Sequence, residues 1–209
     1  MSKKEVIALT GETGTGKSTF GGFLSQHPDV CVIDSDQISK DILFDSNNRT
    51  KLVEIFGEDT SKGQIAKIIY SNPKKKKELE NYIHPKVWEK IDEAIKQSNK
   101  KIIFVESALI FETQNESEKN KKRFKKIVLV TCDRDEQIKR IKEKHHLSKE
   151  EIDQRLATLW PLDFKLRRAN FIVSTDCTKE ELQVKADKLI SILQTPLLVR
   201  ICKRPSPNL

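Results

Sequence analysis

The feature that most constrains the fold is a glycine-rich loop near the start of the chain, residues 11–18, with the sequence GETGTGKS. Its spacing is that of a P-loop, G-x-x-x-x-G-K-[ST], in which consecutive backbone N–H groups curl around phosphate oxygens. A strand-like apolar run at 6–9 precedes the loop, and residues 20–24 favour a helix after it. Because a P-loop lies between a strand and a helix, we expect this chain to bind a nucleoside triphosphate.

Two side chains at the end of the loop have roles that its chemistry predicts. Lys17 is expected to reach the β- and γ-phosphates and to neutralise their oxygens during transfer, which makes it a candidate catalytic residue. The hydroxyl of Ser18 is expected to bind Mg²⁺. A triphosphate together with Mg²⁺ is therefore the predicted ligand of this loop.

Two carboxylates, Asp34 and Asp36, follow a second short apolar run at 30–33. Ligands of open α/β sheets lie beyond the carboxyl ends of the strands. Both aspartates are thus well placed to meet Mg²⁺ and the hydroxyl of a phosphoryl acceptor. The alternative interpretation is a polar turn that caps a helix beginning at Gln37.

Strand-like and helical segments alternate along the chain, which predicts an α/β fold with three layers and a five-stranded parallel sheet. The predicted strands are residues 6–10, 30–33, 101–105, 127–130 and 171–173. Between 38 and 98 the apolar spacing is helical and is punctuated by Pro73 and Pro85. This segment predicts a helical insert of the kind that carries the second substrate in P-loop kinases.

The predicted division has four parts. The nucleotide-binding core comprises residues 1–36, 99–135 and 166–195, the helical acceptor-binding insert 37–98, the lid 136–165 and a basic tail 196–209. The segment between the fourth and fifth strands is rich in arginine and lysine. Its composition is that of a kinase lid, in which cations close over the triphosphate and stabilise charge in the transition state.

The net charge of +8 comes from 39 basic and 31 acidic residues. Much of the excess lies in two lysine-rich runs, 74–77 and 119–126. A solvated surface, a site for phosphate-bearing small molecules and a nucleic-acid patch would each account for it. Because these runs contain almost no aromatic residues, stacking on single-stranded bases has little support. Nucleic acid is therefore not the partner that we expect.

Composition also predicts the compartment. No run of about 18 apolar residues occurs, so no membrane span is expected. The first residues lead directly into the first predicted strand and leave no room for a signal peptide. The four cysteines are scattered without a C-x-x-C pair, as reduced thiols are. We expect a cytoplasmic monomer or weak oligomer.

Absent motifs narrow the class of P-loop protein. A GTPase would carry Asp-x-x-Gly after the third strand and Asn-Lys-x-Asp for the guanine base, and neither occurs in this sequence. A transport ATPase would carry a Leu-Ser-Gly-Gly-Gln-like signature, which is also absent. A small chain with a helical insert and a basic lid remains, and this pattern is typical of small-molecule kinases.

Further motifs make the chain similar to the dephospho-coenzyme A kinase family, from about Val6 to Leu193. The resemblance rests on these segments: Leu-Thr-Gly at 9–11, the P-loop, Ile-Asp-Ser-Asp at 33–36, Asn-Pro at 72–73, Leu-Glu at 79–80, His-Pro at 84–85, Ala-Leu-Ile-Phe-Glu at 108–112, Gln-x-x-Arg at 137–140 and Pro-Leu-Asp-Phe-Lys at 161–165. The P-loop alone is generic. In this order and spacing, the P-loop, Asp-x-Asp and Leu-Glu-x-x-x-His-Pro are specific.

The resemblance implies an activity and a set of site residues. The reaction would be transfer of the γ-phosphoryl group of ATP to the ribose 3′-hydroxyl of dephospho-CoA, with both molecules as substrates and Mg²⁺ as cofactor. The matching ATP-loop residues are Gly14, Thr15, Gly16, Lys17, Ser18 and Thr19. Asp36 matches the general base, Arg140 matches a catalytic lid arginine, and Asp34, His84 and Glu112 fall in motifs that line the acceptor side.

The chain departs from the family pattern at several positions. Glu12 stands where the second glycine of the loop is usual, and its side chain is expected to turn outward. Ala108 replaces a proline, and Leu159 stands where a lid glutamine is usual. These departures bear on substrate affinity more than on the type of reaction.

Other functions stay open at this point, namely another P-loop kinase of a nucleotide or small metabolite and a nucleic-acid-associated ATPase. The acceptor pocket of a dephospho-CoA kinase must offer cations for a diphosphate and an apolar groove for the pantetheine arm. Lys86 and the apolar side chains around it, such as Tyr82 and Trp88, can supply both. A nucleoside monophosphate kinase would instead need an arginine clamp, and Arg49 is the one arginine between 38 and 98.

Overall fold

The computed structural model describes residues 4–114, 123–145, 147–157 and 159–195. The chain divides into two compact units. The first, which we call the core unit, comprises Met1–Ile33 and Asn99–Leu209, and the second, the helical unit, comprises Asp34–Ser98. The predicted basic tail, 196–209, lies outside the described residues.

The core unit is built on a five-stranded parallel sheet, as the alternating pattern predicted. Its strands are β1 (Glu5–Thr10), β2 (Val30–Asp34), β3 (Ile102–Glu106), β4 (Lys126–Thr131) and β5 (Phe171–Ser174), in the order β2-β3-β1-β4-β5. Strand β1 therefore lies in the middle, with Ile7 opposite Phe104 of β3 and Lys126 of β4. The loop that follows β1 leaves from the centre of the carboxyl edge, where open sheets bind ligands.

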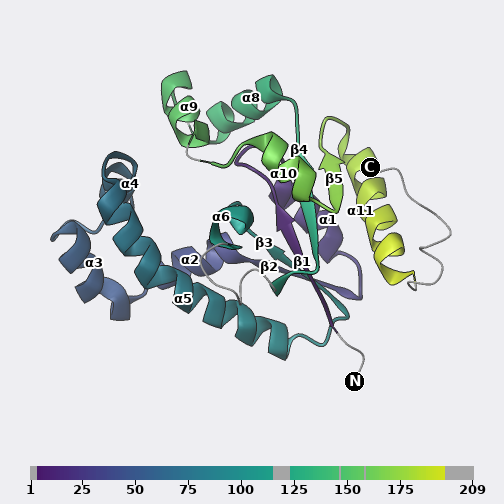
Figure 1. Cartoon of the computed structure of the whole chain (residues 1–209), viewed down its shortest axis with the longest axis horizontal. Coiled ribbons are helices and arrows are strands. Elements are labelled where there is room, and N and C mark those ends of the chain that lie inside the picture. Colours follow the sequence, from purple (N-terminus) through teal and green to yellow (C-terminus); the bar gives the residue numbers. More distant parts are fainter. Residues whose placement is uncertain (1–3, 115–122, 146, 158, 196–209) are drawn as a thin grey trace. The chain divides into compact units, whose positions relative to one another are not determined.

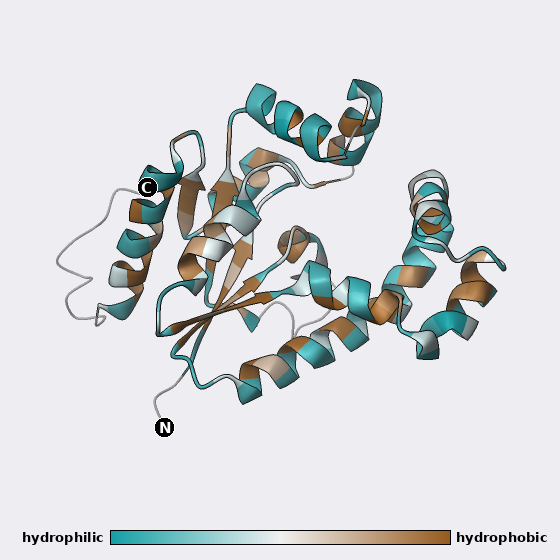
Figure 2. Ribbon diagram, turned by 180° about the vertical axis from the view of Figure 1, so that it is seen from behind, coloured by the Kyte–Doolittle hydropathy of each residue, from teal (hydrophilic) through white to brown (hydrophobic). Residues whose placement is uncertain are grey.

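Helices of the core unit cover the sheet (Figures 1 and 2). The described helices of this unit are α1 (Lys17–Ser25), α6 (Ile110–Gln114), α8 (Arg134–His145), α9 (Lys149–Ala157), α10 (Leu162–Arg168) and α11 (Lys179–Gln194), of which α9 packs on α8 and lies away from the sheet. Helices α1 and α11 pack together, and apolar side chains such as Phe20, Leu24 and Leu189 join those of the strands in one core. Alternate strand residues on the other face, such as Val105, are buried as well. A sheet that is buried on both faces is the middle of three layers, which confirms the predicted architecture.

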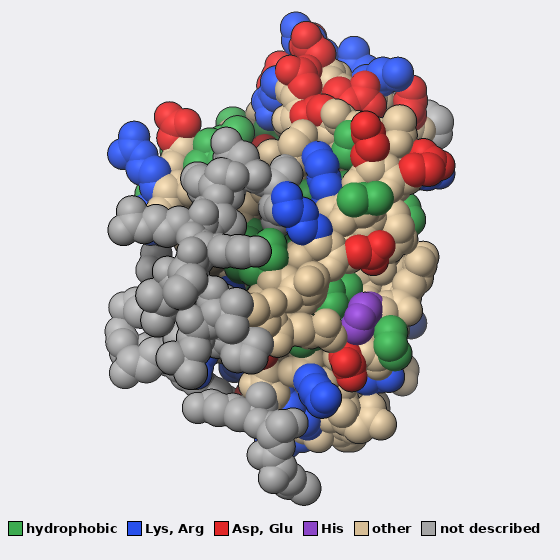
Figure 3. All heavy atoms as spheres, turned by 90° about the vertical axis from the view of Figure 1, so that its right-hand side faces the viewer, with side chains coloured by type: hydrophobic (Ala, Val, Ile, Leu, Met, Phe, Trp, Pro, Cys, Tyr) green, Lys and Arg blue, Asp and Glu red, His purple; other side chains and the backbone are tan. Residues whose placement is uncertain are grey.

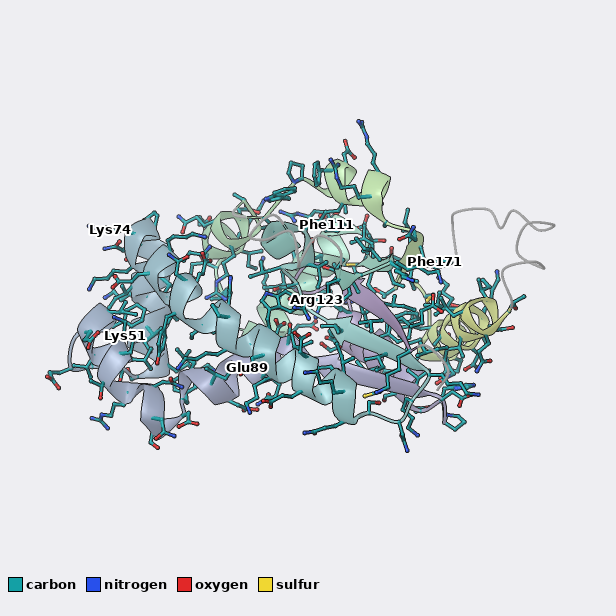
Figure 4. The ribbon with its side chains drawn as sticks, turned by 60° about the horizontal axis from the view of Figure 1, so that its bottom comes forward. Lys51, Lys74, Glu89, Phe111, Arg123 and Phe171 are labelled. Carbon is teal, nitrogen blue, oxygen red and sulfur yellow. The ribbon has the colours of Figure 1, made fainter. Side chains whose placement is uncertain are left out.

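The helical unit consists of α2 (Ser35–Leu43), a short 3₁₀ turn (Ser46–Asn48), α3 (Arg49–Phe56), α4 (Lys62–Ser71) and the long helix α5 (Pro73–Gln97). Helices α2, α3 and α4 all pack on α5. The buried side chains of α5 recur every four residues and form one stripe: Leu79, Ile83, Val87 and Ile91. Lys51 on α3 and Lys74 on α5 can be located in Figure 4.

The start of α5 follows from its sequence. The side chain of Asn72 accepts a hydrogen bond from the Lys75 backbone N–H, and Pro73 occupies the first turn, where its missing N–H costs nothing. The expectation that Pro85 also punctuates a helix is wrong, because Pro85 lies inside α5. A proline there removes one hydrogen bond to the carbonyl of Asn81. Burial of the apolar stripe on both sides of Pro85 offsets this loss, so the helix continues.

The segment between β4 and α10 has a small apolar centre of its own. Ile141 of α8 packs with Ile152 and Leu156 of α9. Ser148 and Glu151 form a capping box at the start of α9, because each side chain accepts a hydrogen bond from the backbone N–H of the other. The lid boundaries, 136–165, stay a prediction.

Among the described helices, none combines the length and the apolar character that crossing a bilayer requires. On the face of the molecule seen in Figure 3, acidic and basic side chains are interspersed. The described part of this face therefore offers a mixed surface and not an extended field of one sign.

Candidate active site

The loop after β1 has the backbone of a phosphate cradle. Gly14 and Gly16 have φ angles of 85° and 81°, in the left-handed region that side chains disfavour. A Cβ atom on Gly14 would lie 2.7 Å from Cγ1 of Ile141 and 2.9 Å from the carbonyl oxygen of Gln137. The loop also closes on itself, because the Thr15 hydroxyl donates to the carbonyl of Glu12 at 2.8 Å. Backbone conformation thus requires glycine at both positions, and the close approach of α8 requires it at Gly14 as well.

Side chains from α8 and from the end of β5 hold this loop in place. The hydroxyl of Thr175 donates to the carbonyl of Thr15 at 2.8 Å, and Arg140 in turn donates to that hydroxyl at 2.8 Å. The Gln137 amide donates to the carbonyl of Thr13 at 2.8 Å. The structure therefore links Arg140, a predicted lid residue, to the P-loop through Thr175. Its catalytic role stays a prediction.

Cys132, just beyond β4, also approaches the loop. Its Sγ atom lies 3.7 Å from the carbonyl oxygen of Gly14, to which the thiol donates. Burial raises the pKa of the Cys132 thiol to about 11. The group is therefore protonated at neutral pH and able to act as this donor.

Lys17 and Ser18, at the start of α1, converge on one carboxylate. Lys17 Nζ lies 2.8 Å and Ser18 Oγ 2.6 Å from Oε1 of Glu106, and both donate to it. Glu106 ends β3 and is only 4% exposed, and Lys17 is 7% exposed. The sequence reasoning assigned no role to Glu106. The signal available was its position, an acidic residue at the end of a strand beside the P-loop strand.

Gly21 makes room for this carboxylate. A Cβ atom there would lie 2.6 Å from Oε2 of Glu106, so any larger residue would displace the glutamate. The arrangement leaves Glu106 and the hydroxyl of Ser18 side by side. Both are oxygen ligands of the kind that Mg²⁺ prefers, so the donor set of this site fits that ion.

A second charged cluster includes Glu12, the second residue of the loop. Lys165 of α10 places Nζ 3.5 Å from Oε1 of Glu12 and 3.3 Å from Oε1 of Glu112. The Gln137 amide also donates to Glu12, at 3.2 Å. The side chain of Glu12 is only 15% exposed, so the expectation that it turns outward is wrong. Pairing with a buried lysine gives the physical reason.

Glu112, predicted on the acceptor side, lies in the first turn of α6. Its Oε1 atom also accepts a hydrogen bond of 3.1 Å from the Trp160 backbone N–H. The neighbouring Phe111, labelled in Figure 4, is buried and meets Phe164 edge-on at 6.4 Å between ring centroids. Trp160 packs on the same Phe164 at 4.5 Å, which is packing within the core unit.

The two predicted aspartates belong to the helical unit. The Asp34 side chain accepts hydrogen bonds from the backbone N–H groups of Asp36 and Gln37, at 2.9 and 3.0 Å. It thus caps α2, which was the alternative interpretation, although that helix begins at Ser35 and not at Gln37. Asp36 lies in the first turn, and both carboxylates are exposed. Their roles toward substrate stay predictions.

His84 lies in the middle of α5 and is half-buried. Two residues later, Lys86 donates to the Asn48 side chain at 2.6 Å and contacts the Tyr82 hydroxyl at 2.8 Å. The Tyr82 hydroxyl donates to the same Asn48 oxygen at 2.6 Å. The helical unit therefore places one lysine, one tyrosine and one asparagine in a single polar cluster beside its apolar stripe.

Comparison with known proteins identifies the family to which the chain belongs. The family model described as dephospho-CoA kinase matches residues 5–181. The chain belongs to the dephospho-CoA kinase family. This confirms the family that the ordered motifs predicted, and with it the class of enzyme, a phosphotransferase.

Individual relatives extend the match over nearly the whole chain. A dephospho-CoA kinase of Lactobacillus acidophilus is 28% identical over 194 residues, which are 88% of this chain and 95% of that protein. A solved structure from Thermus thermophilus is 25% identical, has a TM-score of 0.79, and aligns with 93% of this chain and 100% of its own. A dephospho-CoA kinase structure from Campylobacter jejuni is 25% identical, with a TM-score of 0.58 and coverage of 91% and 97%.

Proposed function

We propose that this chain transfers the γ-phosphoryl group of ATP to the ribose 3′-hydroxyl of dephospho-CoA, giving coenzyme A and ADP. The observation that carries the proposal is the match of the dephospho-CoA kinase family to residues 5–181, over a P-loop whose Lys17 and Ser18 converge on Glu106. ATP is the phosphoryl donor that this family implies. The transfer is the step that completes coenzyme A.

The donor side of the reaction falls to the core unit. The backbone N–H groups of the loop bind the phosphates, and Lys17 neutralises the oxygens between the β- and γ-positions. For this, the ammonium of Lys17 has to exchange Glu106 for phosphate oxygens as its partner. Ser18 and Glu106 would hold Mg²⁺, which would supply further neutralisation of phosphate charge. Arg140, tied to the loop through Thr175, adds a second cation near it.

The acceptor side falls to Asp36, Asp34, His84 and Glu112. Asp36 orients the 3′-hydroxyl and accepts its proton, and Asp34 holds the start of α2 on which Asp36 stands. In a loose transition state, orientation of the hydroxyl is the larger part of this role. His84 and Glu112 contribute to the acceptor pocket.

The charged side chains of the helical unit favour dephospho-CoA as the acceptor. Dephospho-CoA carries an internal diphosphate and a long pantetheine arm with aliphatic stretches. Lys86, in its cluster with Tyr82 and Asn48, offers a cation and donors beside the apolar stripe of α5. A nucleoside monophosphate kinase holds the terminal phosphate of its acceptor with arginine side chains. The helical unit has Arg49 as its one arginine, so such an arginine clamp is hard to build there.

The test is a panel of acceptors with ATP and Mg²⁺ under equal conditions: dephospho-CoA, AMP, CMP and dTMP. Dephospho-CoA is expected to give the highest kcat/KM, and ³¹P NMR of the product should place the new phosphate on the ribose 3′ oxygen. A higher kcat/KM for any nucleoside monophosphate, or a phosphate at another position, contradicts the assignment. ADP formation without any acceptor would indicate an ATPase instead.

Two further proposals accompany the activity. We place the protein in the cytoplasm, where a reduced environment suits its scattered cysteines. We also propose that it works as a monomer or weak oligomer, because the predicted donor and acceptor residues all come from one chain. Sedimentation equilibrium with and without both substrates measures this directly.

A further inference from the structure

Lys165 is the most completely buried charged side chain among the described residues, with 1% of it exposed. Its ammonium lies between two carboxylates, Glu12 at 3.5 Å and Glu112 at 3.3 Å. Neither contact has hydrogen-bond geometry, so Lys165 Nζ and Oε2 of Glu112 are both buried without a hydrogen-bond partner. A buried ammonium is stable only beside opposite charge, so this lysine depends on both glutamates and they depend on it.

The cluster links segments that are far apart in the sequence. Glu12 is the second residue of the P-loop, Glu112 stands in α6, and Lys165 stands in α10. Glu112 also accepts the hydrogen bond from the Trp160 backbone, just before α10. One ammonium therefore joins the phosphate-binding loop to the end of the predicted lid.

The position of Glu12 makes this link matter for the nucleotide. The backbone carbonyl of Glu12 accepts the Thr15 hydroxyl, so Glu12 is part of the loop that cradles the phosphates. A carboxylate with no cation beside it there would repel a bound triphosphate. Besides Lys165, Glu12 has the neutral Gln137 amide and Arg134, whose NH1 is 4.0 Å away and whose side chain is half exposed. Lys165 is thus the buried cation that neutralises Glu12.

From this arrangement we infer that Lys165 is a positioning residue for ATP. It neutralises Glu12 and fixes its carboxylate, and so lets a P-loop that contains an acidic residue accept a triphosphate. Lys165 does this through Glu12 and not through contact with the phosphates. The inference rests on the proposed function only as far as ATP binding, and it does not depend on the identity of the acceptor.

The test is a double-mutant cycle with Lys165→Met, Glu12→Gln and the double variant. Affinity for a non-hydrolysable ATP analogue is measured by calorimetry without acceptor, and KM for ATP and kcat are measured with dephospho-CoA. Lys165→Met is expected to weaken analogue binding about 30-fold, the range of a close charge pair, and to raise KM far more than it lowers kcat. Glu12→Gln alone is expected to bind the analogue about 3-fold more tightly, since one negative charge is removed.

The decisive variant is Lys165→Met/Glu12→Gln, which is expected to recover at least about 10-fold of the lost analogue affinity because the uncompensated carboxylate is gone. Lys165→Met/Glu112→Gln is the matched control: it also removes one carboxylate, but not the one in the loop, and affinity should stay low. If the Glu12 double variant binds as poorly as Lys165→Met, Lys165 acts on the phosphates directly and the inference is overturned. Equal recovery in both double variants would reduce Lys165 to a structural role.

The test still decides if Lys165→Met fails to fold or if the acceptor assignment is wrong. If Lys165→Met does not fold, Glu12→Gln alone still decides, because weaker analogue binding in that variant contradicts the inference. If dephospho-CoA proves not to be the acceptor, the calorimetric cycle is unaffected. Failure of the acceptor assignment and failure of this inference are therefore distinguishable.

Discussion

One buried lysine, Lys17, belongs to the phosphate-binding loop and another, Lys165, contacts it, and the two differ in how they are paired. Lys17 donates a hydrogen bond of 2.8 Å to one carboxylate, Glu106, which the hydroxyl of Ser18 also contacts. Lys165 lies between two carboxylates at 3.3 and 3.5 Å and donates a hydrogen bond to neither. Lys17 belongs to a motif whose lysine binds phosphate, so it must be able to leave Glu106 when a phosphate binds. Lys165 lies beside two carboxylates, and this excess of negative charge favours an ammonium that stays in place.

The comparison teaches that burial of a lysine does not by itself identify a phosphate ligand. What separates the two is the balance of charge and the element on which each stands. Lys17 begins α1, directly behind the loop, whereas Lys165 is in the middle of α10. The variants below test whether the two lysines act by these different routes.

The largest effect is expected from Lys17→Ala. Turnover should fall about 10⁴-fold, within the range that one cation on a transferring phosphoryl group supplies. Stability should fall as well, by about 1–3 kcal/mol, because Glu106 is left buried without its cation and keeps the Ser18 hydroxyl as a donor. Steady-state kinetics and thermal unfolding measure the two effects.

The control for that variant is Lys17→Ala/Glu106→Gln. Replacing the carboxylate by an amide removes the buried charge, so the melting temperature should return toward that of the unaltered protein. Turnover should not recover. Ordinary turnover in Lys17→Ala would contradict the assignment of the P-loop.

Asp36→Asn is expected to have the next largest effect, a loss of turnover of roughly 10²–10⁴-fold. The substitution keeps the shape and removes the proton acceptor. Asp36 lies in the helical unit, to which we assign the acceptor side, so affinity for an ATP analogue should be unchanged, unlike in either lysine variant. Calorimetry and single-turnover kinetics separate binding from chemistry.

Asp34→Asn is the matched control, since asparagine also caps helices well and α2 should stay intact. A greater loss of turnover in Asp34→Asn than in Asp36→Asn would show that the roles of the pair are reversed. Loss of analogue binding in both variants would instead indicate a role in holding the metal ion.

Glu106→Gln should have a smaller effect, which is weaker binding of Mg²⁺. An amide is a weaker ligand for Mg²⁺ than a carboxylate, so the Mg²⁺ concentration for half-maximal activity should rise about 10–100-fold. Turnover at saturating Mg²⁺ should recover substantially. Activity that depends on Mg²⁺ as in the unaltered protein would remove Glu106 from the proposed metal site.

Local patterns predicted what is local in this molecule. The five strands and the P-loop are found where short stretches of sequence indicated them. They could be predicted because each depends on residues within about ten positions of one another. The dephospho-CoA kinase family was recognised for the same reason, from short motifs in a fixed order.

The rest could not be predicted because it depends on partners distant in sequence. Glu12 and Lys165 are separated by most of the chain, and no spacing rule connects them. Glu106 carries no motif of its own, and its function follows from Lys17 and Ser18 lying against it. Pro85 misled in the opposite way, because a local signal for a break was outweighed by packing of the α5 stripe.

The smallest effect concerns Cys132, whose thiol donates to the carbonyl of Gly14 and so reports on the phosphate-binding loop. Burial raises its pKa to about 11, so only about one thiol in a thousand is ionised at pH 8, against about a quarter for an ordinary cysteine of pKa ~8.5. Alkylation of Cys132 by iodoacetamide should therefore be slow at pH 8 and rise about tenfold per pH unit up to about pH 11.

The sign of the linked stability follows from the same shift. The folded chain keeps this proton to higher pH than the unfolded chain, so the contribution is present below about pH 9 and is lost as the pH rises through about 11. Peptide mapping by mass spectrometry gives the labelling rate, with the urea-unfolded chain as the control. If Cys132 is labelled at pH 8 as fast in the folded chain as in the unfolded one, the thiol is not held against Gly14. The support that α8, β4 and β5 provide to this loop would then be looser than the hydrogen bonds of Thr175 and Gln137 indicate.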